Sequence, residues 1–178
     1  MTGGTALRWI TLGWIPWVLF WLCIHQSLPA QTASIASASV DRVLVLKQKR
    51  ILRLLHGTHI VKEYKVALGG SPVGPKTQQG DHKTPEGVYV LDSRNSHSHY
   101  YRSIHISYPT MEQRAAARRR GVSAGGDVFV HGLPNGYRSV GAAQTLYDWT
   151  DGCIAVKDSE MDEIWRAVAD GTPIEIRP

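Results

Sequence analysis

Residues 40–178 alternate short apolar segments with turn-forming residues, which is typical of a β-rich domain. Val40–Leu46 and Ile51–Leu55 flank a polar Lys-Gln-Lys turn and predict a hairpin, and Ile60–Leu68 predicts a third strand. Residues 69–87 are dense in Gly and Pro and predict a long loop. Further strands are expected at Val88–Leu91, Tyr101–Tyr108, Val128–His131 and Pro173–Ile176.

Two segments have the pattern of helices with defined ends. Thr110 and Gln113 form a capping box at the start of the first, and Gly121 can close it. The second begins at Asp158 or the next residue and stops at Gly171. Its apolar stripe consists of Met161, Ile164, Trp165 and Val168. Because the many short strands do not alternate with helices, we predict a mostly β fold, a β-sandwich or barrel with a few short helices.

A hydrophobic segment, Trp9–Ile24, lies near the N-terminus. Its 16 residues fall short of the roughly 20 that a membrane span needs. Ala36-Ser37-Ala38 fits the small-x-small pattern of a cleavage site. We expect residues 1–30 to be a signal peptide, or alternatively an N-terminal anchor, and residues 31–39 to be an Ala/Ser linker. Residues 40–178 are then one exported domain, expected in the periplasm.

The charge balance is mildly basic. The chain holds 20 Lys and Arg against 15 Asp and Glu, a net charge of +5, and without Arg8 in the leader the exported part carries about +4. Arg118-Arg119-Arg120 lie where the first helix ends, a place that favours cations. No aromatic residues interleave with them. We therefore expect a solvated helix end and no nucleic acid partner, with contact to anionic glycan or lipid as the secondary reading.

Cys153 is the one cysteine of the predicted exported domain. A lone thiol has no intramolecular disulfide partner, and in an oxidising compartment it is a liability unless it does chemistry. Cys153 is therefore the candidate nucleophile, and His131, at the end of an apolar strand, is the candidate base. The alternative is an inert buried cysteine and a hydrogen-bonded histidine at a strand end. Residue chemistry alone leaves both open.

The neighbours of Cys153 fit the first interpretation. Gly152 allows a substrate to approach the backbone closely. The backbone N–H of Cys153 and a neighbouring N–H could then hold a tetrahedral oxyanion.

The sequence resembles the L,D-transpeptidase catalytic domain, often called the YkuD-type domain. The resemblance rests on four segments that occur in the family's order: Gly80-Asp81-His82-Lys83-Thr84-Pro85-Glu86-Gly87, Ile104-His105-Ile106-Ser107-Tyr108-Pro109, Gly126-Asp127-Val128-Phe129-Val130-His131-Gly132 and Thr150-Asp151-Gly152-Cys153-Ile154-Ala155-Val156. The hairpin from Val40 to Leu68 also resembles the strands that open that domain, so the resemblance covers nearly the whole exported part.

The resemblance implies a β-rich fold with a cysteine in a cleft, and acyl transfer on peptidoglycan stem peptides without metal or cofactor. It assigns Cys153 as nucleophile, His131 as proton acceptor and donor, and Gly152 to the turn that forms the oxyanion site. Supporting or substrate-binding positions are Thr150, Asp151, Gly132, His105 and Tyr108. Two positions depart from the family pattern: many members have His in place of Asp151, and Arg or Asn in place of Ala155. Asp151 could orient His131 or accept from a substrate amine.

These observations predict a cysteine L,D-transpeptidase. It would form a thioacyl enzyme with a stem tetrapeptide, release D-Ala and transfer the acyl group to an amine, for cell wall cross-linking or lipoprotein attachment. Two alternatives stay open: an L,D-carboxypeptidase or amidase-type hydrolase that uses the same residues, and a non-catalytic wall-binding module. A metal site built on His97, His99 and His105 is not expected, because no acidic or cysteine ligands lie at helpful spacings.

Overall fold

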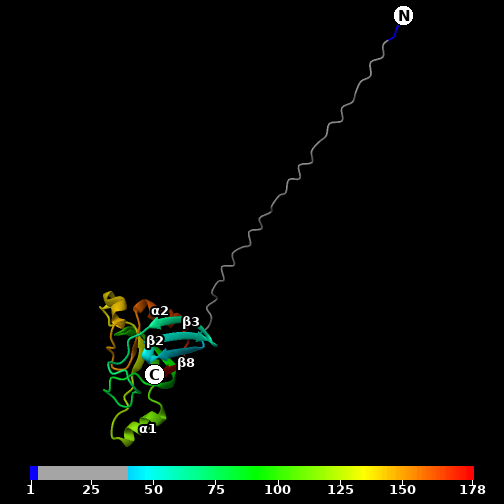
Figure 1. Cartoon of the computed structure of the whole chain (residues 1–178). Coiled ribbons are helices and arrows are strands. Elements are labelled where there is room, and N and C mark those ends of the chain that lie inside the picture. The colour runs from blue at the N-terminus through cyan, green and yellow to red at the C-terminus, as the bar shows by residue number, and fades with distance from the viewer. Residues whose placement is uncertain (4–39) are drawn as a thin grey trace. The chain divides into compact units, whose positions relative to one another are not determined.

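The computed structural model describes residues 1–3 and 40–178, and residues 40–178 form a folded β-rich domain (Figure 1). Apart from residues 1–3, the expected leader at 1–30 and linker at 31–39 lie outside the described residues. Within the part of the chain that the structure describes, no helix has the length and hydrophobicity needed to cross a bilayer.

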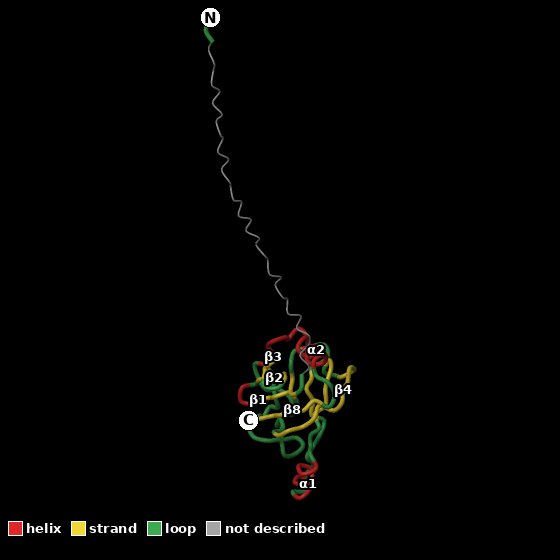
Figure 2. Tube along the Cα trace, turned by 90° about the vertical axis from the view of Figure 1, so that its right-hand side faces the viewer, coloured by secondary structure: helices red, strands yellow, loops and turns green. Residues whose placement is uncertain are grey.

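One eight-stranded sheet forms the framework of the domain (Figure 2). The strands are β1 (Arg42–Leu46), β2 (Ile51–His56), β3 (His59–Lys65), β4 (Gly87–Ser98), β5 (Tyr101–Ile106), β6 (Val128–His131), β7 (Ile154–Ala155) and β8 (Thr172–Arg177). Their order across the sheet is β3-β2-β1-β8-β4-β5-β6-β7. The pairs β1–β8 and β6–β7 are parallel, and the other neighbours are antiparallel. The last strand of the chain therefore joins the N-terminal hairpin to the strands that lead to the site.

The sheet curls so that its two edge strands, β3 and β7, approach each other. The segment directly after β3 is hydrogen-bonded to β7 and to Thr150. Ala67 and Ala155 exchange backbone hydrogen bonds of 3.0 and 2.9 Å, and Gly69 forms a bridge with Thr150. The predicted mostly β, barrel-like fold is confirmed, with the strands of residues 40–178 in a single curled sheet. This closure satisfies backbone groups that an open edge would leave unpaired, and it places the loop after β3 beside Cys153.

Two α-helices and two 3₁₀ segments complete the domain: α1 (Met111–Arg119), α2 (Asp158–Ala167), η1 (Lys47–Lys49) and η2 (Arg138–Thr145). The predicted stripe of α2 packs into the core through Met161, Ile164 and Val168, each at most 1% exposed. Its half-buried Trp165 lies under two guanidinium groups, those of Arg94 and Arg102, at 5.0 and 5.3 Å.

Helix α1 projects from the domain at the end opposite α2 in both views (Figures 1 and 2). Its predicted capping box is present: Gln113 N–H donates to Thr110 Oγ1 at 3.2 Å, and Thr110 N–H donates to Gln113 Oε1 at 2.8 Å. Arg118, Arg119 and Arg120 are exposed where the helix ends, as predicted.

The largest difference from the sequence-based elements is β4. The predicted strand Val88–Leu91 is the inner part of a strand that runs from Gly87 to Ser98. Its outer half is polar and largely exposed, and it pairs with β5 as a protruding hairpin. Exposure on both faces removes the apolar alternation from which a strand is recognised. The sequence also gave no indication of η2.

The long loop at residues 69–86 is fixed by two buried polar side chains. Thr84 Oγ1 accepts from the Gly69 N–H at 3.0 Å. Lys47 Nζ donates to the carbonyls of Gly74 and Thr84 and to Glu86 Oε1, at 2.7, 2.9 and 2.7 Å. These hydrogen bonds tie the loop to itself and to η1, and the Gly70 N–H donates to the Thr150 carbonyl at 3.0 Å. The predicted loop is therefore an ordered wall beside the Cys153 turn.

Candidate active site

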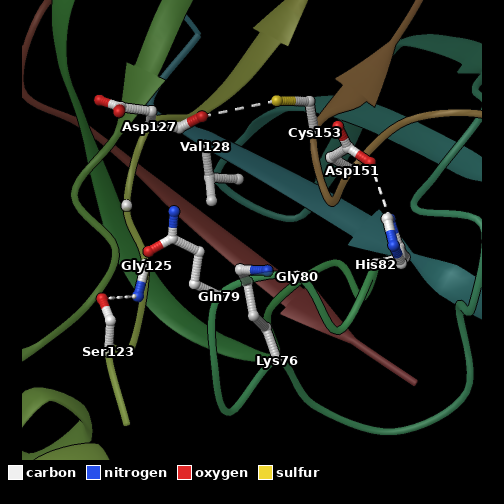
Figure 3. A pocket seen from close by; sticks show the side chains of 11 residues that line it. Lys76, Gln79, Gly80, His82, Ser123, Gly125, Asp127, Val128, Asp151 and Cys153 are labelled. Atoms are coloured by element: carbon white, nitrogen blue, oxygen red, sulfur yellow. Dashed lines mark hydrogen bonds and ion pairs between the residues drawn. The ribbon is translucent and has the colours of Figure 1, made fainter.

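Cys153 lies directly before β7, where two clefts meet (Figure 3 shows the larger). The larger cleft has a volume of about 530 Å³ and the smaller about 410 Å³. Cys153, Asp127 and Asp151 line both clefts. A half-buried thiol at this junction can be reached from two sides, and both volumes lie in the usual range of ligand sites.

The two clefts differ in character. The larger is lined by the 76–82 loop, the 123–128 segment and the Cys153 turn. The smaller has a more aromatic wall, to which Tyr100, Phe129, His131 and Trp149 contribute. Cys153 and His131, which are 22 positions apart in the chain, thus line one cleft. The parallel pairing of β6 with β7 brings them there, because His131 is the register partner of Ala155.

The Cys153 thiol is in a resting arrangement. Its Sγ donates to the Asp127 carbonyl oxygen at 3.7 Å, and the dashed line in Figure 3 marks this contact. Burial raises the pKa of the Cys153 thiol, and the charge of Asp151 adds to this effect. A hydrogen bond with the Phe129 backbone and the charge of Lys76 act in the opposite direction. Because the pKa is raised on balance, the resting sulfur is a neutral thiol that needs a base.

The His131 imidazole is buried and hydrogen-bonded on one side. The side chain is buried, with Nδ1 at 2.7 Å from the Gly132 carbonyl oxygen. A carbonyl can only accept, so Nδ1 carries the proton and the Nε2 lone pair is the acceptor. Burial lowers the pKa of His131 to about 4, against a smaller opposing effect of the Gly132 hydrogen bond. The imidazole is therefore neutral at neutral pH and competent to take a proton.

Two aromatic rings bury the imidazole. The ring centroids of Tyr100 and Trp149 lie 4.6 and 5.8 Å from that of His131, and 6.2 Å from each other. Neither residue was among the sequence-predicted site positions. Tyr100 comes from the β4–β5 turn and Trp149 from the loop before Cys153, so no sequence pattern connects them.

The turn before Cys153 is held by Thr150 and Gly152. Thr150 Oγ1 donates to the Cys153 carbonyl at 2.8 Å and accepts from the Gly152 N–H at 3.1 Å. Gly152 has φ +131°, and a Cβ there would come within 2.6 Å of the Lys83 carbonyl oxygen. Glycine is thus required both by the backbone conformation and by the close approach of the 76–83 loop.

Asp151 pairs with His82 and not with His131. Its Oδ1 lies 2.7 Å from Nδ1 of His82, and this pair bridges the Cys153 turn and the opposite loop (Figure 3). The side chains are 90% and 55% exposed, so the pair sits at the mouth of the larger cleft.

Three other predicted positions lie in the scaffold. Gly132 has no room for a side chain, because a Cβ would approach Asp158 Oδ1 within 2.7 Å. His105 pairs with Asp92 at 2.7 Å and is absent from the lining of both clefts. Tyr108 is buried and donates to the Ala124 carbonyl at 2.9 Å. His105 lies on a strand, β5, as expected, but its side chain pairs with Asp92 of β4.

One lining residue was not among the sequence-predicted site positions. Lys76 lies in the Gly- and Pro-rich loop and is buried in the wall of the larger cleft, where it pairs with Asp81 at 2.8 Å. As for metals, no group of three or more His, Cys, Asp or Glu side chains gathers among residues 1–3 and 40–178.

Comparison with known proteins places this geometry in a family. Residues 40–176 match the family model of the YkuD L,D-transpeptidase catalytic domain. YafK of Escherichia coli K12 is 28% identical over 134 residues, which cover 71% of this chain and 46% of YafK.

Solved structures show the same fold. The helical cell shape determining protein Pgp2 from Campylobacter jejuni matches with a TM-score of 0.58 and 26% identity, over 76% of this chain and 46% of Pgp2. An L,D-transpeptidase from Xylanimonas cellulosilytica matches with a TM-score of 0.51 and 18% identity, over 80% of this chain and 62% of that protein. The chain spans just under half the length of YafK and of Pgp2. On the family match across its folded domain, this chain belongs to the YkuD family of L,D-transpeptidase catalytic domains.

Proposed function

We propose that this domain is a peptidoglycan L,D-transpeptidase in which Cys153 is the nucleophile and His131 the general base. One observation supports this more than any other: a neutral His131, held by Gly132 in the tautomer that accepts at Nε2, lines the same cleft as the only described thiol of residues 40–178. The expected location is the periplasm, where the stem peptides are.

The reaction begins when the thiol turns from the Asp127 carbonyl toward His131. Nε2 takes the thiol proton as Sγ attacks the carbonyl carbon of the third stem residue, expected to be meso-diaminopimelate. The tetrahedral intermediate collapses, His131 returns the proton to the departing amine, and D-Ala leaves. The product is a thioester between Cys153 and the shortened stem peptide.

The oxyanion of the intermediate needs N–H donors at the Cys153 turn. The Gly152 N–H already donates to Thr150 Oγ1, so it is engaged in holding the turn. The Cys153 N–H makes no hydrogen bond within the described part of the chain, and we assign it as the oxyanion donor. Thr150 and Gly152 then act by positioning that donor.

Two clefts that meet at the sulfur favour transfer to a second peptide, because donor and acceptor can approach from different sides. The acceptor amine, from another stem peptide or a lipoprotein lysine, attacks the thioester while His131 takes its proton, and the thiol is restored. Water in place of the amine would make the same site a carboxypeptidase.

The test is intact-mass spectrometry of the exported domain with a disaccharide-tetrapeptide. We expect an adduct on Cys153 equal to the donor minus D-Ala, and none on the matched Cys153→Ala variant. Addition of an acceptor stem peptide should clear the adduct and yield a cross-linked product.

The outcomes separate the candidate functions. Release of the free tripeptide with acceptor present indicates the hydrolase. Absence of both adduct and released D-Ala, with tetrapeptide binding retained, indicates a non-catalytic wall-binding module. An equal adduct on Cys153→Ala contradicts the assignment of the nucleophile.

A further inference from the structure

Two lysine side chains of the described domain are buried, and their surroundings differ. An ammonium has three N–H donors. Lys47 uses all three, on two carbonyls and a carboxylate. Lys76 is 5% exposed, and within residues 40–178 its ammonium has one hydrogen-bond partner, Asp81 Oδ1 at 2.8 Å. Two N–H groups of Lys76 therefore remain for another acceptor.

Asp81 accepts hydrogen bonds from other donors besides Lys76. Its carboxylate also accepts the backbone N–H groups of Thr77, Gln78 and Lys83, at 2.7, 3.1 and 3.1 Å. Burial alone would raise the pKa of Asp81, but the hydrogen bonds from Lys76 and from these backbone groups lower it on balance. Asp81 is thus a stable carboxylate that orients Lys76 and closes the loop.

The free N–H groups of Lys76 lie close to the nucleophile. Lys76 lines the larger cleft together with Cys153. A Cβ built on Gly152 would lie 3.6 Å from Nζ, and one built on Gly125 would lie 3.6 Å from Cε. Figure 3 shows the side chain extending from its loop toward Cys153 and Asp151. The Lys76 side chain thus lies near Gly125, and its ammonium lies beside Gly152, the residue before Cys153.

We propose that Lys76 binds a carboxylate of the donor peptide in the larger cleft, with Nζ donating the hydrogen bonds that Asp81 leaves unused. The inference rests on the proposed function and deepens it by naming the substrate feature that is recognised. No other Lys or Arg of the described residues lines this cleft. An ammonium in a largely buried setting binds a carboxylate through strong, charge-assisted hydrogen bonds.

The carboxylate that fits best is the C-terminal one of the leaving residue. Its carbon is three bonds from the scissile carbonyl carbon, so it lies within about 4 Å of the atom that sulfur attacks. A cation beside Gly152 is in the right place for it. Such a contact selects the end of a peptide, because an internal peptide bond offers no carboxylate there. The carboxylate on the side chain of the third residue is the other source of the same chemistry.

The experiment compares three donors on matched variants. The donors are a tetrapeptide with all carboxylates free, its C-terminal amide, and a form amidated on the side chain of the third residue. The proteins are wild type, Lys76→Met, Lys76→Gln and Lys65→Met, the last of which removes an exposed charge from β3. The readout is kcat/KM for release of the terminal residue.

We expect wild type and Lys65→Met to prefer the free acid over one of the amides by roughly 10- to 100-fold. Lys76→Met and Lys76→Gln should lose that preference because their rate on the acid falls more than their rate on the amide. The effect of the lost charge on the Cys153 thiol acts on all donors alike and cancels in the ratio. Loss of preference at the C-terminal amide identifies the leaving residue as the source, and loss at the side-chain amide identifies the third residue. Preferences that persist in both Lys76 variants would overturn the proposal.

A binding measurement separates this inference from the proposed function. In the Cys153→Ala background no acylation can occur, and calorimetry gives the Kd of each donor directly. Lys76→Gln should weaken binding of the acid at least 10-fold and leave the amide unaffected. If wild type forms no thioacyl adduct, the proposed function fails, but this comparison still decides the role of Lys76. Equal Kd values with and without Lys76 would refute it.

Discussion

Acidification should destabilise this domain through His131. The side chain is 3% exposed, and burial lowers the pKa of His131 from 6.5 to about 4 in the folded state. The unfolded chain therefore binds a proton below pH 6.5, whereas the folded protein does so only near pH 4. Stability from the neutral imidazole is complete above pH 6.5 and is lost as pH falls from 6.5 toward 4.

The magnitude follows from the pKa difference, at 1.36 kcal/mol per unit. Between pH 7 and pH 5 the free energy of unfolding should fall by roughly 2 kcal/mol because of this group, and by roughly 3 kcal/mol on reaching pH 4. The pKa of Asp81 is lowered from 3.8, so its contribution is lost only at more acidic pH. The window from pH 7 to 5 thus reports mainly on His131.

Urea denaturation of wild type and His131→Asn at pH 7, 6 and 5 provides the assay. The asparagine amide can replace Nδ1–H as donor to Gly132 but does not titrate. Any cost of the substitution itself is present at each pH, so the difference in slope isolates the imidazole. Parallel curves for the two proteins would refute the assignment of a buried neutral histidine, and with it the resting state proposed for catalysis.

Three further predictions concern the thiol and its scaffold. Because burial raises the pKa of Cys153, the rate of its alkylation by iodoacetamide, measured by mass spectrometry, should be low at pH 7 and rise about tenfold per pH unit toward pH 9. An alkylation rate that is already constant below pH 7 would instead indicate a thiolate. Gly69→Ala places a Cβ 2.3 Å from the His82 carbonyl oxygen and should lower the free energy of unfolding by about 2 kcal/mol, with an unchanged urea midpoint as the contrary result. Lys47→Met leaves Glu86 and two carbonyls without their buried donor and should cost about 3 kcal/mol, measured by thermal unfolding; a Tm within error of wild type would contradict it.

Local patterns determined the elements that have one apolar face. The stripe of α2 is visible in the sequence, because burial of one face imposes a period of 3.6. Strands β1 and β2 are visible as short apolar runs on either side of a polar turn. The capping box at Thr110 was equally visible, since its hydrogen bonds join residues three positions apart. The outer half of β4 was not, because a strand exposed on both faces has no such period.

The identity of Cys153 and His131 as candidates also came from the sequence, through a lone thiol and a histidine at a strand end within family-like segments. The roles of Asp151 and His105 could not be obtained in that way. Each pairs with a residue far along the chain or across a hairpin, His82 for Asp151 and Asp92 for His105. Such pairings depend on side-chain direction, which a motif does not encode.

Tertiary structure alone decided the protonation state and the shape of the site. Tyr100 and Trp149 bury His131 from two separate segments, and this desolvation keeps its imidazole neutral. The curl of the sheet brings the 76–83 loop against Gly152, so that Lys76 joins a cleft with a sulfur 77 positions away in the chain. The sequence determined which chemical groups are available, whereas pKa values and neighbours follow from burial and closure, which are properties of the folded sheet as a whole.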